Sequence, residues 1–489
     1  MARTIRRYLI WLVMLLGCSS QDFCGFKDTA PIISLPVPEN VASAYGWGTV
    51  LMPLSFEEGG VPKDFIAAAG GPRSETDVFQ LAVGDELAIE RSVALSDICD
   101  RDAALNDETS TCYERHAGAG LAFRSTWQDG QNCVVVGMAG HDRDPGVGFW
   151  CADGTRHLQD DRSFIPIEHE VNTLAYVLSP VERVFAGTAH TLQLLDGDAT
   201  SFFRVVWRDD PDLPRAGANI EALSTLEADE VDGGYLLAVG FPGEQQVLIG
   251  EVESPADGEE ETEMVLHACI EMDEEGFGSV AKLARLGTSS PDDPGPPMLL
   301  AGARWGYENR VPAVYVFDLD LSVASEDVVC TPSTPTLTLE CGPVSGDDTG
   351  VDTSADVDCT VDGSGFGAAV DVGNIDDTPE REVIVGCPGA TADGYTRAGA
   401  AYIFRPTRNG ADVLSVLIDS SEDRQEVQLG AGVAIAPAGI RAEPIVAGPG
   451  EGSLLMFLCT GVGDEPPTWD SPLNRSNSLE DARCRNLQR

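Results

Sequence analysis

A short apolar run that ends in glycine recurs seven times along the chain. The runs end at Gly70, Gly137, Gly187, Gly240, Gly302, Gly386 and Gly448, and successive glycines lie 50 to 84 residues apart. Recurrence at such a spacing indicates a fold assembled from similar small units, as in solenoids and propellers. The longest interval contains a Pro-, Thr- and Asp-rich insert at residues 330–359.

Each unit offers three or four short strands punctuated by glycine and proline. A glycine turn leads into an apolar strand before most runs, as in GFGSVAKL from Gly276 and GFGAAVDV from Gly365. A strand rich in aromatic or β-branched residues follows most runs, as in PAVYVFDL from Pro312 and GAAYIF from Gly399. No segment shows the period of an amphipathic helix, so the pattern predicts an all-β protein.

These units favour a seven-bladed β-propeller. One small sheet cannot bury both of its faces, whereas sheets stacked around an axis can, and a ring leaves only short, protected edges. We expect the segment PIISLPV, from Pro31, to pair with the last unit and close the ring. The units that begin at Val171 and Asn219 lack the glycine turn, so it stays open whether they are full blades. A two-domain β-sandwich is the structural alternative.

The unit at residues 365–404 resembles the FG-GAP repeat, the blade unit of integrin α-subunit propellers and of many bacterial surface proteins. Phe366-Gly367 stands for the FG of that repeat, and Gly386-Cys387-Pro388 stands for the GAP, with cysteine in place of alanine. The fifth and seventh units match in part, and the first four match mainly by spacing. The resemblance covers about residues 41–459 and implies a propeller of degenerate FG-GAP-like repeats, which we assign to residues 32–460.

FG-GAP units often bind calcium in the loop between their first two strands, through oxygens at alternate loop positions. The resemblance places these positions at Asn374, Asp376, Thr378, Glu380 and Glu382. All five can offer oxygen, the donor atom that Ca²⁺ requires. A proline replaces the usual glycine of the motif, and the alternative is a degenerate loop that keeps its shape without metal. The resemblance therefore predicts one structural calcium site.

The first residues have the pattern of an export signal. Three arginines precede an apolar core at residues 8–16, which is too short to span a bilayer. The sequence LLGC at residues 15–18 resembles the lipobox of bacterial lipoproteins, in which the cysteine is acylated and becomes the mature N-terminus. We expect a signal peptide at 1–17, a tether at 18–31 held to the membrane by lipid on Cys18 alone, and a polar tail at 461–489. Ser19 favours, by the same resemblance, the outer membrane, on its periplasmic or its cell-surface side.

Thirteen cysteines occur in the chain. If Cys18 carries lipid, twelve are left, and an even number in an exported chain predicts disulfides. Cys133 and Cys151 begin and end two consecutive predicted strands, so we expect them to meet across the sheet. Cys99 and Cys112 would close a short acidic loop. No Cys-x-x-Cys occurs, and the spacings give little support to a zinc-thiolate site.

The charge balance and the missing motifs exclude several functions. Asp and Glu number 80 against 31 Lys and Arg, a formal net charge of −49. Such a surface repels phosphate backbones, which excludes nucleic-acid binding, and it keeps an exported protein dispersed, so we expect a monomer. No metalloprotease, nucleophile-elbow or phosphate-loop motif occurs. His141 stands beside Asp142 and Asp144 in the segment GHDRDPG, for which a polar loop between blades is the simpler interpretation.

The sequence therefore predicts a non-enzymatic, lipid-anchored propeller that binds a protein or a glycan. The alternative is a propeller-fold enzyme that acts on polysaccharide as a lyase or hydrolase, which would need basic and acidic groups converging in a pocket. A purely structural envelope protein is a third interpretation.

Overall fold

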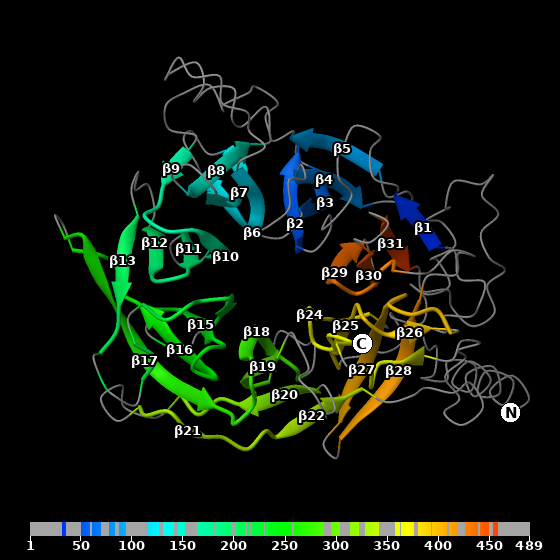
Figure 1. Ribbon diagram of the computed structural model, residues 1–489. Coiled ribbons are helices and arrows are strands. Elements are labelled where there is room, and N and C mark those ends of the chain that lie inside the picture. Colours follow the sequence, from blue (N-terminus) through cyan, green and yellow to red (C-terminus); the bar gives the residue numbers. More distant parts are fainter. Residues whose placement is uncertain are drawn as a thin grey trace, which may run out of the picture.

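The chain folds as a ring of small antiparallel sheets in the computed structural model (Figure 1). The structure describes residues 32–35, 50–58, 61–69, 78–83, 88–93, 115–126, 131–140 and 145–151. From 164 to 457 it describes all residues except 179–181, 197–201, 209, 211–212, 216, 229, 232, 257–258, 288–294, 304–312, 322–327, 342–356, 362, 376–379, 393, 408–409, 419–425, 439–440 and 449–452. None of the described residues is helical, so the all-β prediction is confirmed.

The first four sheets follow one another along the chain, each with its strands in sequence order. The first contains β2 (Val50–Glu58), β3 (Val61–Ala69), β4 (Val78–Val83) and β5 (Ala88–Val93). The second contains β6 (Arg115–Thr126), β7 (Gln131–Gly140), β8 (Gly146–Cys151) and β9 (Phe164–Pro166). The third contains β10 (Val171–Val177), β11 (Arg183–Thr188), β12 (Leu192–Asp196) and β13 (Phe203–Val206). The fourth contains β14 (Ala222–Glu227), β15 (Tyr235–Phe241), β16 (Gln246–Val252) and β17 (Glu261–Glu271). The units from Val171 and Asn219 are thus complete four-stranded blades.

Three further sheets complete the ring. The fifth contains β18 (Phe277–Arg285), β19 (Pro297–Ala303), β20 (Ala313–Asp318) and β22 (Leu337–Glu340). The sixth contains β24 (Val370–Gly373), β25 (Glu382–Cys387), β27 (Ala400–Thr407) and β28 (Gly410–Leu417). The seventh contains β29 (Gly432–Ala438), β30 (Arg441–Gly448) and β31 (Ser453–Phe457), followed by β1 (Ile32–Leu35) as its outer strand. Short strands β21 (Thr331–Pro332), β23 (Val357–Asp358) and β26 (Thr391–Ala392) lie outside these four-stranded units, and β23 pairs with β26.

The N-terminal strand closes the ring, as the sequence predicts. β1 pairs antiparallel with β31, in a register that sets Ile32 opposite Phe457 and Leu35 opposite Leu454. In Figure 1 the blue strand β1 therefore lies beside the red strand β31. At the axis, the first strand of each blade contacts the first strand of the next, and β29 of the last blade contacts β2 of the first. The described strands thus form a closed β-propeller of seven blades.

The recurrent glycines are required where neighbouring blades approach each other near the axis. A Cβ placed on Gly386 would lie 1.9 Å from the carbonyl oxygen of Gly430, and one on Gly240 would lie 2.0 Å from that of Gly278. Gly278 and Gly430 also adopt positive φ angles of 92° and 94°, which L side chains rarely adopt. The same contact therefore recurs between blades four and five and between blades six and seven.

The blade cores are filled by the aromatic residue of the glycine turn. Phe366 is fully buried, and its ring centroid lies 5.7 Å from that of Tyr402 and 6.1 Å from that of Phe404. Phe277 occupies the corresponding place in blade five, 6.0 Å from Phe317. Burying such side chains stabilises each by roughly 1.5–3 kcal/mol. In the Phe-Gly pair, the phenylalanine thus fills the blade core, and the glycine lets the backbones of neighbouring blades approach each other.

Candidate functional site: the first turn of blade six and the ring axis

The hairpin between β24 and β25 carries the predicted calcium ligands. Gly373 lies opposite Glu382 in the strand register, so residues 374–381 form the connection between the two strands. Asn374, Glu380 and Glu382 are among the described residues. Asp376 and Thr378 lie outside the described residues, and the calcium site stays a prediction.

Glu382 holds the base of this hairpin. Its side chain is fully buried, and its Oε2 accepts a hydrogen bond of 2.8 Å from the backbone N–H of Ile375. Its Oε1 lies 3.6 Å from Nε of Arg405 on β27. Ile375 itself packs in the core shared by blades six and seven. The carboxylate of Glu382 therefore fixes the first residues of the loop, whereas the side chain of Glu380 is exposed to solvent.

Polar side chains occupy one recurrent position of the inner strands in blades four, five and six. Ser224 lies opposite Ala238, Lys282 opposite Leu300, and Asp371 opposite Ile384. Each partner residue stands two places before the glycine that ends its run. With Thr225, these side chains form what we call the axial polar cluster: Ser224, Thr225, Lys282 and Asp371.

Asp371 is the centre of this cluster. It is 7% exposed, its Oδ1 lies 2.7 Å from Nζ of Lys282 on β18, and its Oδ2 accepts a 2.8 Å hydrogen bond from the backbone N–H of Ile435 on β29. A single carboxylate thus joins three successive blades. Its charge also reaches the inner strand of blade three, because burial first and the charge of Asp371 second raise the pKa of Tyr176.

The other two members join blades three, four and five. Oγ of Ser224 accepts a hydrogen bond of 2.9 Å from the backbone N–H of Leu283. Oγ1 of Thr225 donates to the backbone carbonyl of Tyr176. Leu283 and Ile435 hold the same place relative to the glycines of their turns, Gly278 and Gly430. Every member of the axial polar cluster therefore bonds to an adjacent blade.

The cluster was missed in the sequence because its partners lie in other repeats. The signal was present: Lys282 is one of only three lysines in the chain, and it stands between Ala281 and Leu283 in a predominantly apolar strand. The cluster thus contains one ion pair, between Lys282 and Asp371, and its other hydrogen bonds go to backbone groups of adjacent blades. In the part of the chain that the structure describes, no three His, Cys, Asp or Glu side chains converge on a point where a metal ion would fit.

Of the predicted disulfide partners, Cys133 and Cys151 lie directly opposite each other in the register of β7 and β8. That is the placement the sequence predicts, while the bond between the two sulfur atoms stays a prediction. Cys18, Cys99 and Cys112 lie outside the described residues, as do His141, Asp142 and Asp144.

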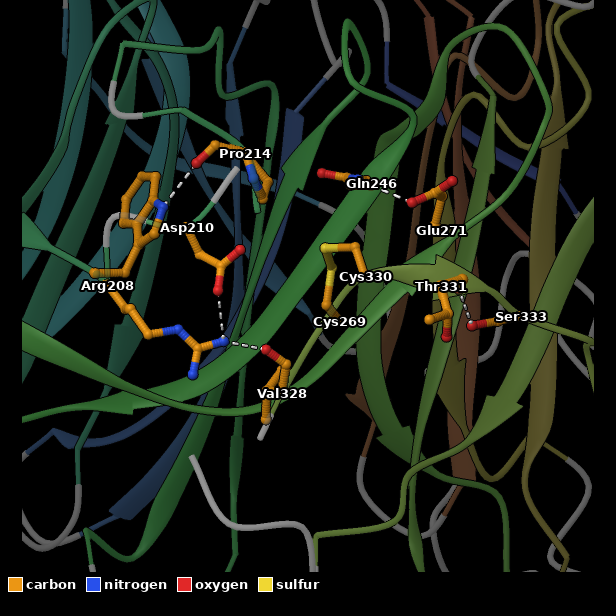
Figure 2. The surroundings of a disulfide bond; sticks show 11 residues. Arg208, Asp210, Pro214, Gln246, Cys269, Glu271, Val328, Cys330, Thr331 and Ser333 are labelled. Carbon is orange, nitrogen blue, oxygen red and sulfur yellow. Dashed lines mark hydrogen bonds and ion pairs between the residues drawn. A yellow bond between two sulfur atoms is a disulfide. The ribbon is translucent and has the colours of Figure 1, made fainter. Parts of the chain in front are cut away.

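Two disulfides that the sequence did not assign involve cysteines of the insert at residues 330–359. Cys269 of β17 bonds to Cys330, and Cys341 bonds to Cys359. Figure 2 shows the first of them beside Val328, whose carbonyl oxygen accepts a hydrogen bond from the guanidinium of Arg208. Next to the disulfide, β21 pairs parallel with β17, with Thr331 opposite Ile270. The chain between β20 and β22 therefore crosses from blade five to the outer edge of blade four and is cross-linked there.

Cys387 corrects the expectation that an even number of cysteines would all pair. It is a fully buried free thiol, and its Sγ donates a hydrogen bond of 3.4 Å to the carbonyl oxygen of Ser364. Burial raises the pKa of this thiol well above its ordinary value. Cys387 stands where the FG-GAP motif has alanine, and it behaves as a small core residue.

Comparison with known proteins adds little to this geometry. No protein-family description and no curated protein matches the sequence. Similar solved structures include BBS1N in complex with ARL6DN (TM-score 0.45, 10% identity, 87% of this chain and 97% of that chain). They also include YCF48 bound to D1 peptide (TM-score 0.42, 10% identity, 88% of this chain and 98% of that chain). A third is the WD40 domain of Toxoplasma gondii coronin (TM-score 0.41, 9% identity, 90% of this chain and 92% of that chain). At these scores the similarities carry no argument about function.

Proposed function

We propose that this chain is a lipid-anchored, non-enzymatic propeller of FG-GAP-like repeats that binds a basic protein partner through its loops. The observation that carries the proposal is that the side chains of the axial polar cluster are bonded to other groups of the protein. Lys282 and Asp371 are engaged with each other, and Asp371 is also bonded to the backbone of blade seven, which supports a structural joint at the axis rather than a reaction centre. Recognition would then fall to the loops, the usual carriers of function on a rigid scaffold.

The charge of the chain favours a basic partner. A surplus of 49 carboxylates over basic groups attracts cationic surfaces and speeds their association at low ionic strength. The two disulfides support export, because disulfides persist in oxidising compartments. Acylation of Cys18 would then hold the ring at the outer membrane.

The test uses the mature chain with Cys18→Ser, immobilised and exposed to envelope extract. We expect a basic protein to be retained at low salt and released by a few hundred millimolar salt, with binding reproduced by that purified protein. Retention of a neutral glycan, indifferent to salt, would indicate a glycan-binding propeller instead. Time-dependent cleavage of a polysaccharide, lost in His141→Ala, would replace the proposal with the enzymatic alternative.

We further propose that the blade-six loop holds one calcium ion through Asn374, Asp376, Thr378, Glu380 and Glu382. Supporting this, the carboxylate of Glu382 lies at the base of the loop, where it accepts a hydrogen bond from the N–H of Ile375. A ligand that binds only the folded state adds about 2.7 kcal/mol at a hundredfold excess over its dissociation constant. Chelator should therefore lower the melting temperature, and Asp376→Ala should lower it similarly and abolish the effect of chelator.

Asp347→Ala, in the acidic insert, is the matched control and should leave the response to chelator unchanged. A melting temperature indifferent to chelator in the unsubstituted protein, together with no heat on calcium titration, would leave the loop as a metal-free hairpin.

A further inference from the structure

Two histidines from separate connections meet on one face of the ring. His169 lies in the connection between β9 and β10, and His190 lies in the turn between β11 and β12. Because the strands of each blade alternate in direction, these two connections emerge on the same face, opposite the β24–β25 loop. The ring centroids of His169 and His190 lie 4.7 Å apart, with an interplanar angle of 81°.

This separation fits two imidazoles bound to one metal ion. A metal–nitrogen bond of about 2.0–2.1 Å, extended by about 1.1 Å to the ring centre, puts the centroids of two adjacent ligands roughly 4.5–5 Å apart. Imidazole is a preferred donor for Zn²⁺, Cu²⁺ and Ni²⁺. The observed distance of 4.7 Å falls within that range.

The surroundings of His190 orient its ring. Nδ1 of His190 lies 3.3 Å from the backbone carbonyl oxygen of Gly217. Because a carbonyl oxygen can only accept, this contact favours a proton on Nδ1, and in the neutral imidazole Nε2 then has a lone pair for a metal. A hydrogen bond from the other ring nitrogen to a carbonyl is the usual second contact of a metal-bound histidine.

Hydrogen bonds hold the backbone of His190 and the backbone two residues before His169. Oγ1 of Thr188, a fully buried residue, accepts hydrogen bonds from the backbone N–H of His190 (3.1 Å) and from that of Thr191 (2.8 Å). Beside His169, the N–H of Ile167 donates to the carbonyl of Pro145 at 2.8 Å. Pre-positioned ligands lose little conformational entropy on binding a metal.

Charge and exposure complete the site. His190 is exposed and His169 is half-buried, so the pair is open to solvent. His169 stands between Glu168 and Glu170, both exposed, whose carboxylates attract cations. With two protein donors, further coordination positions remain for water or for a group from another molecule.

We infer that His169 and His190 form a binding site for a divalent transition-metal ion of the Zn²⁺, Cu²⁺ and Ni²⁺ class, separate from the predicted calcium loop and independent of the proposed function. The probe is Cu²⁺, added to the full mature chain with Cys18→Ser and without a histidine tag. Titration gives the affinity, and electron paramagnetic resonance gives the number of nitrogen ligands.

The informative variants are His169→Phe and His190→Phe, which keep an aromatic contact between the two turns but remove one metal ligand. We expect two nitrogen ligands in the unsubstituted protein, one in each variant, and at least tenfold weaker Cu²⁺ binding in each variant. If a Phe variant fails to fold, His190→Asn replaces it, because the amide can still donate to the Gly217 carbonyl. His267→Gln, at a histidine on β17 of blade four, is the matched control and should bind Cu²⁺ like the unsubstituted protein.

Three results would overturn the inference. The first is Cu²⁺ binding that is unchanged in both Phe variants, which would make the pair an aromatic contact. The second is an all-oxygen ligand spectrum, which would assign the ion to surface carboxylates. The third is no binding by the unsubstituted protein at micromolar Cu²⁺.

Discussion

At the scale of single residues, the blades are joined by a few buried polar side chains, and one of them, Arg183, bonds to four other residues. It is 6% exposed; its Nε lies 2.9 Å from Asp196, and its Nη1 donates to the hydroxyl of Tyr235 at 2.7 Å. The same group donates to the carbonyl of Val252, and Nη2 donates to Ser254. Burial alone disfavours the charged guanidinium, but Tyr235 and Asp196 outweigh it and raise the pKa of Arg183. One guanidinium thus bonds blade three to blade four.

Arg183→Ala should destabilise the protein strongly. It leaves the carboxylate of Asp196 without its ion-pair partner and removes one of the two donors to the carbonyl of Val252, the other being the hydroxyl of Tyr235. Breaking a buried ion pair costs about 3–5 kcal/mol. Arg204→Ala, on β13 of the same blade, is the matched control, because Arg204 and Glu261 are about half exposed and such pairs contribute under about 1 kcal/mol. Thermal unfolding measures both. Equal shifts in the two variants would contradict a structural role for Arg183.

The buried tyrosines predict how stability depends on alkaline pH. Burial is the main cause that raises the pKa of Tyr176, Tyr235 and Tyr402. A tyrosine in the unfolded chain has a pKa of about 10. Because the folded state keeps these protons longer, the stability they contribute is present below about pH 10 and is lost as the pH rises further. At pH 11 the native protein should show less tyrosinate absorbance than the unfolded chain, and the absorbance should rise as the protein unfolds. Tyr402→Phe should reduce this rise. Full ionisation before unfolding would contradict this.

At the scale of elements, the insert at residues 330–359 connects the rims of blades four and five. β21 pairs with β17, and the Cys269–Cys330 disulfide closes a sequence separation of 61 residues. β13 also pairs parallel with β17, so the outer strands of blades three and four belong to one sheet. These contacts at the rim supplement the polar contacts at the axis.

Replacing Cys269 and Cys330 together by serine should cost about 4 kcal/mol on the chain-entropy model, since the bond restricts a long loop of the unfolded chain. Hydrogen exchange should increase first in β17, which pairs with β21 in the sheet, and in β22, which follows β21 in the chain. The Cys341→Ser/Cys359→Ser variant is the comparison: it opens a separation of 18 residues, for which the same model gives about 3 kcal/mol, and should leave β17 protected. Faster exchange in distant blades only would contradict the assignment.

The contrast between these elements shows what the sequence could predict. The apolar runs and glycine turns predicted the seven sheets, because each follows from local strand and turn chemistry and from the need to bury both faces of a small sheet. The pairing of Cys269 with Cys330 and of Lys282 with Asp371 joins different repeats. Local pattern carries no information about which distant residues meet, so connectivity and the axial polar cluster needed the structure.

The predicted calcium loop illustrates the same limit. Its alternating oxygens could be read from the residues, but the burial of Glu382 and its bond to Ile375 depend on how β24 and β25 are stacked against blade seven. Cys387 is similar: a count of cysteines cannot distinguish a thiol that fills a core from one that forms a disulfide.

At the scale of the whole molecule, the ring is closed by four residues. β1 completes the last blade by pairing with β31, and it is the one strand of that blade from the other end of the chain. Without it, β31 would become the outer edge of its sheet, with unpaired backbone groups open to another chain. The two ends of the chain thus meet in the last blade, whose inner strand β29 contacts β2 of the first blade at the axis.

A chain that begins at residue 36 should therefore be less stable than one that begins at residue 32. We expect the longer chain to melt like the full mature protein, and the shorter chain to melt several degrees lower and to self-associate through the exposed edge of β31. Calorimetry and light scattering measure these two effects. An added peptide of the sequence at residues 31–37, PIISLPV, should restore the melting temperature in proportion to its occupancy, whereas a scrambled peptide should not. Equal melting temperatures and a monomeric state for both chains would mean that the contacts between β29 and β2 alone hold the ring closed.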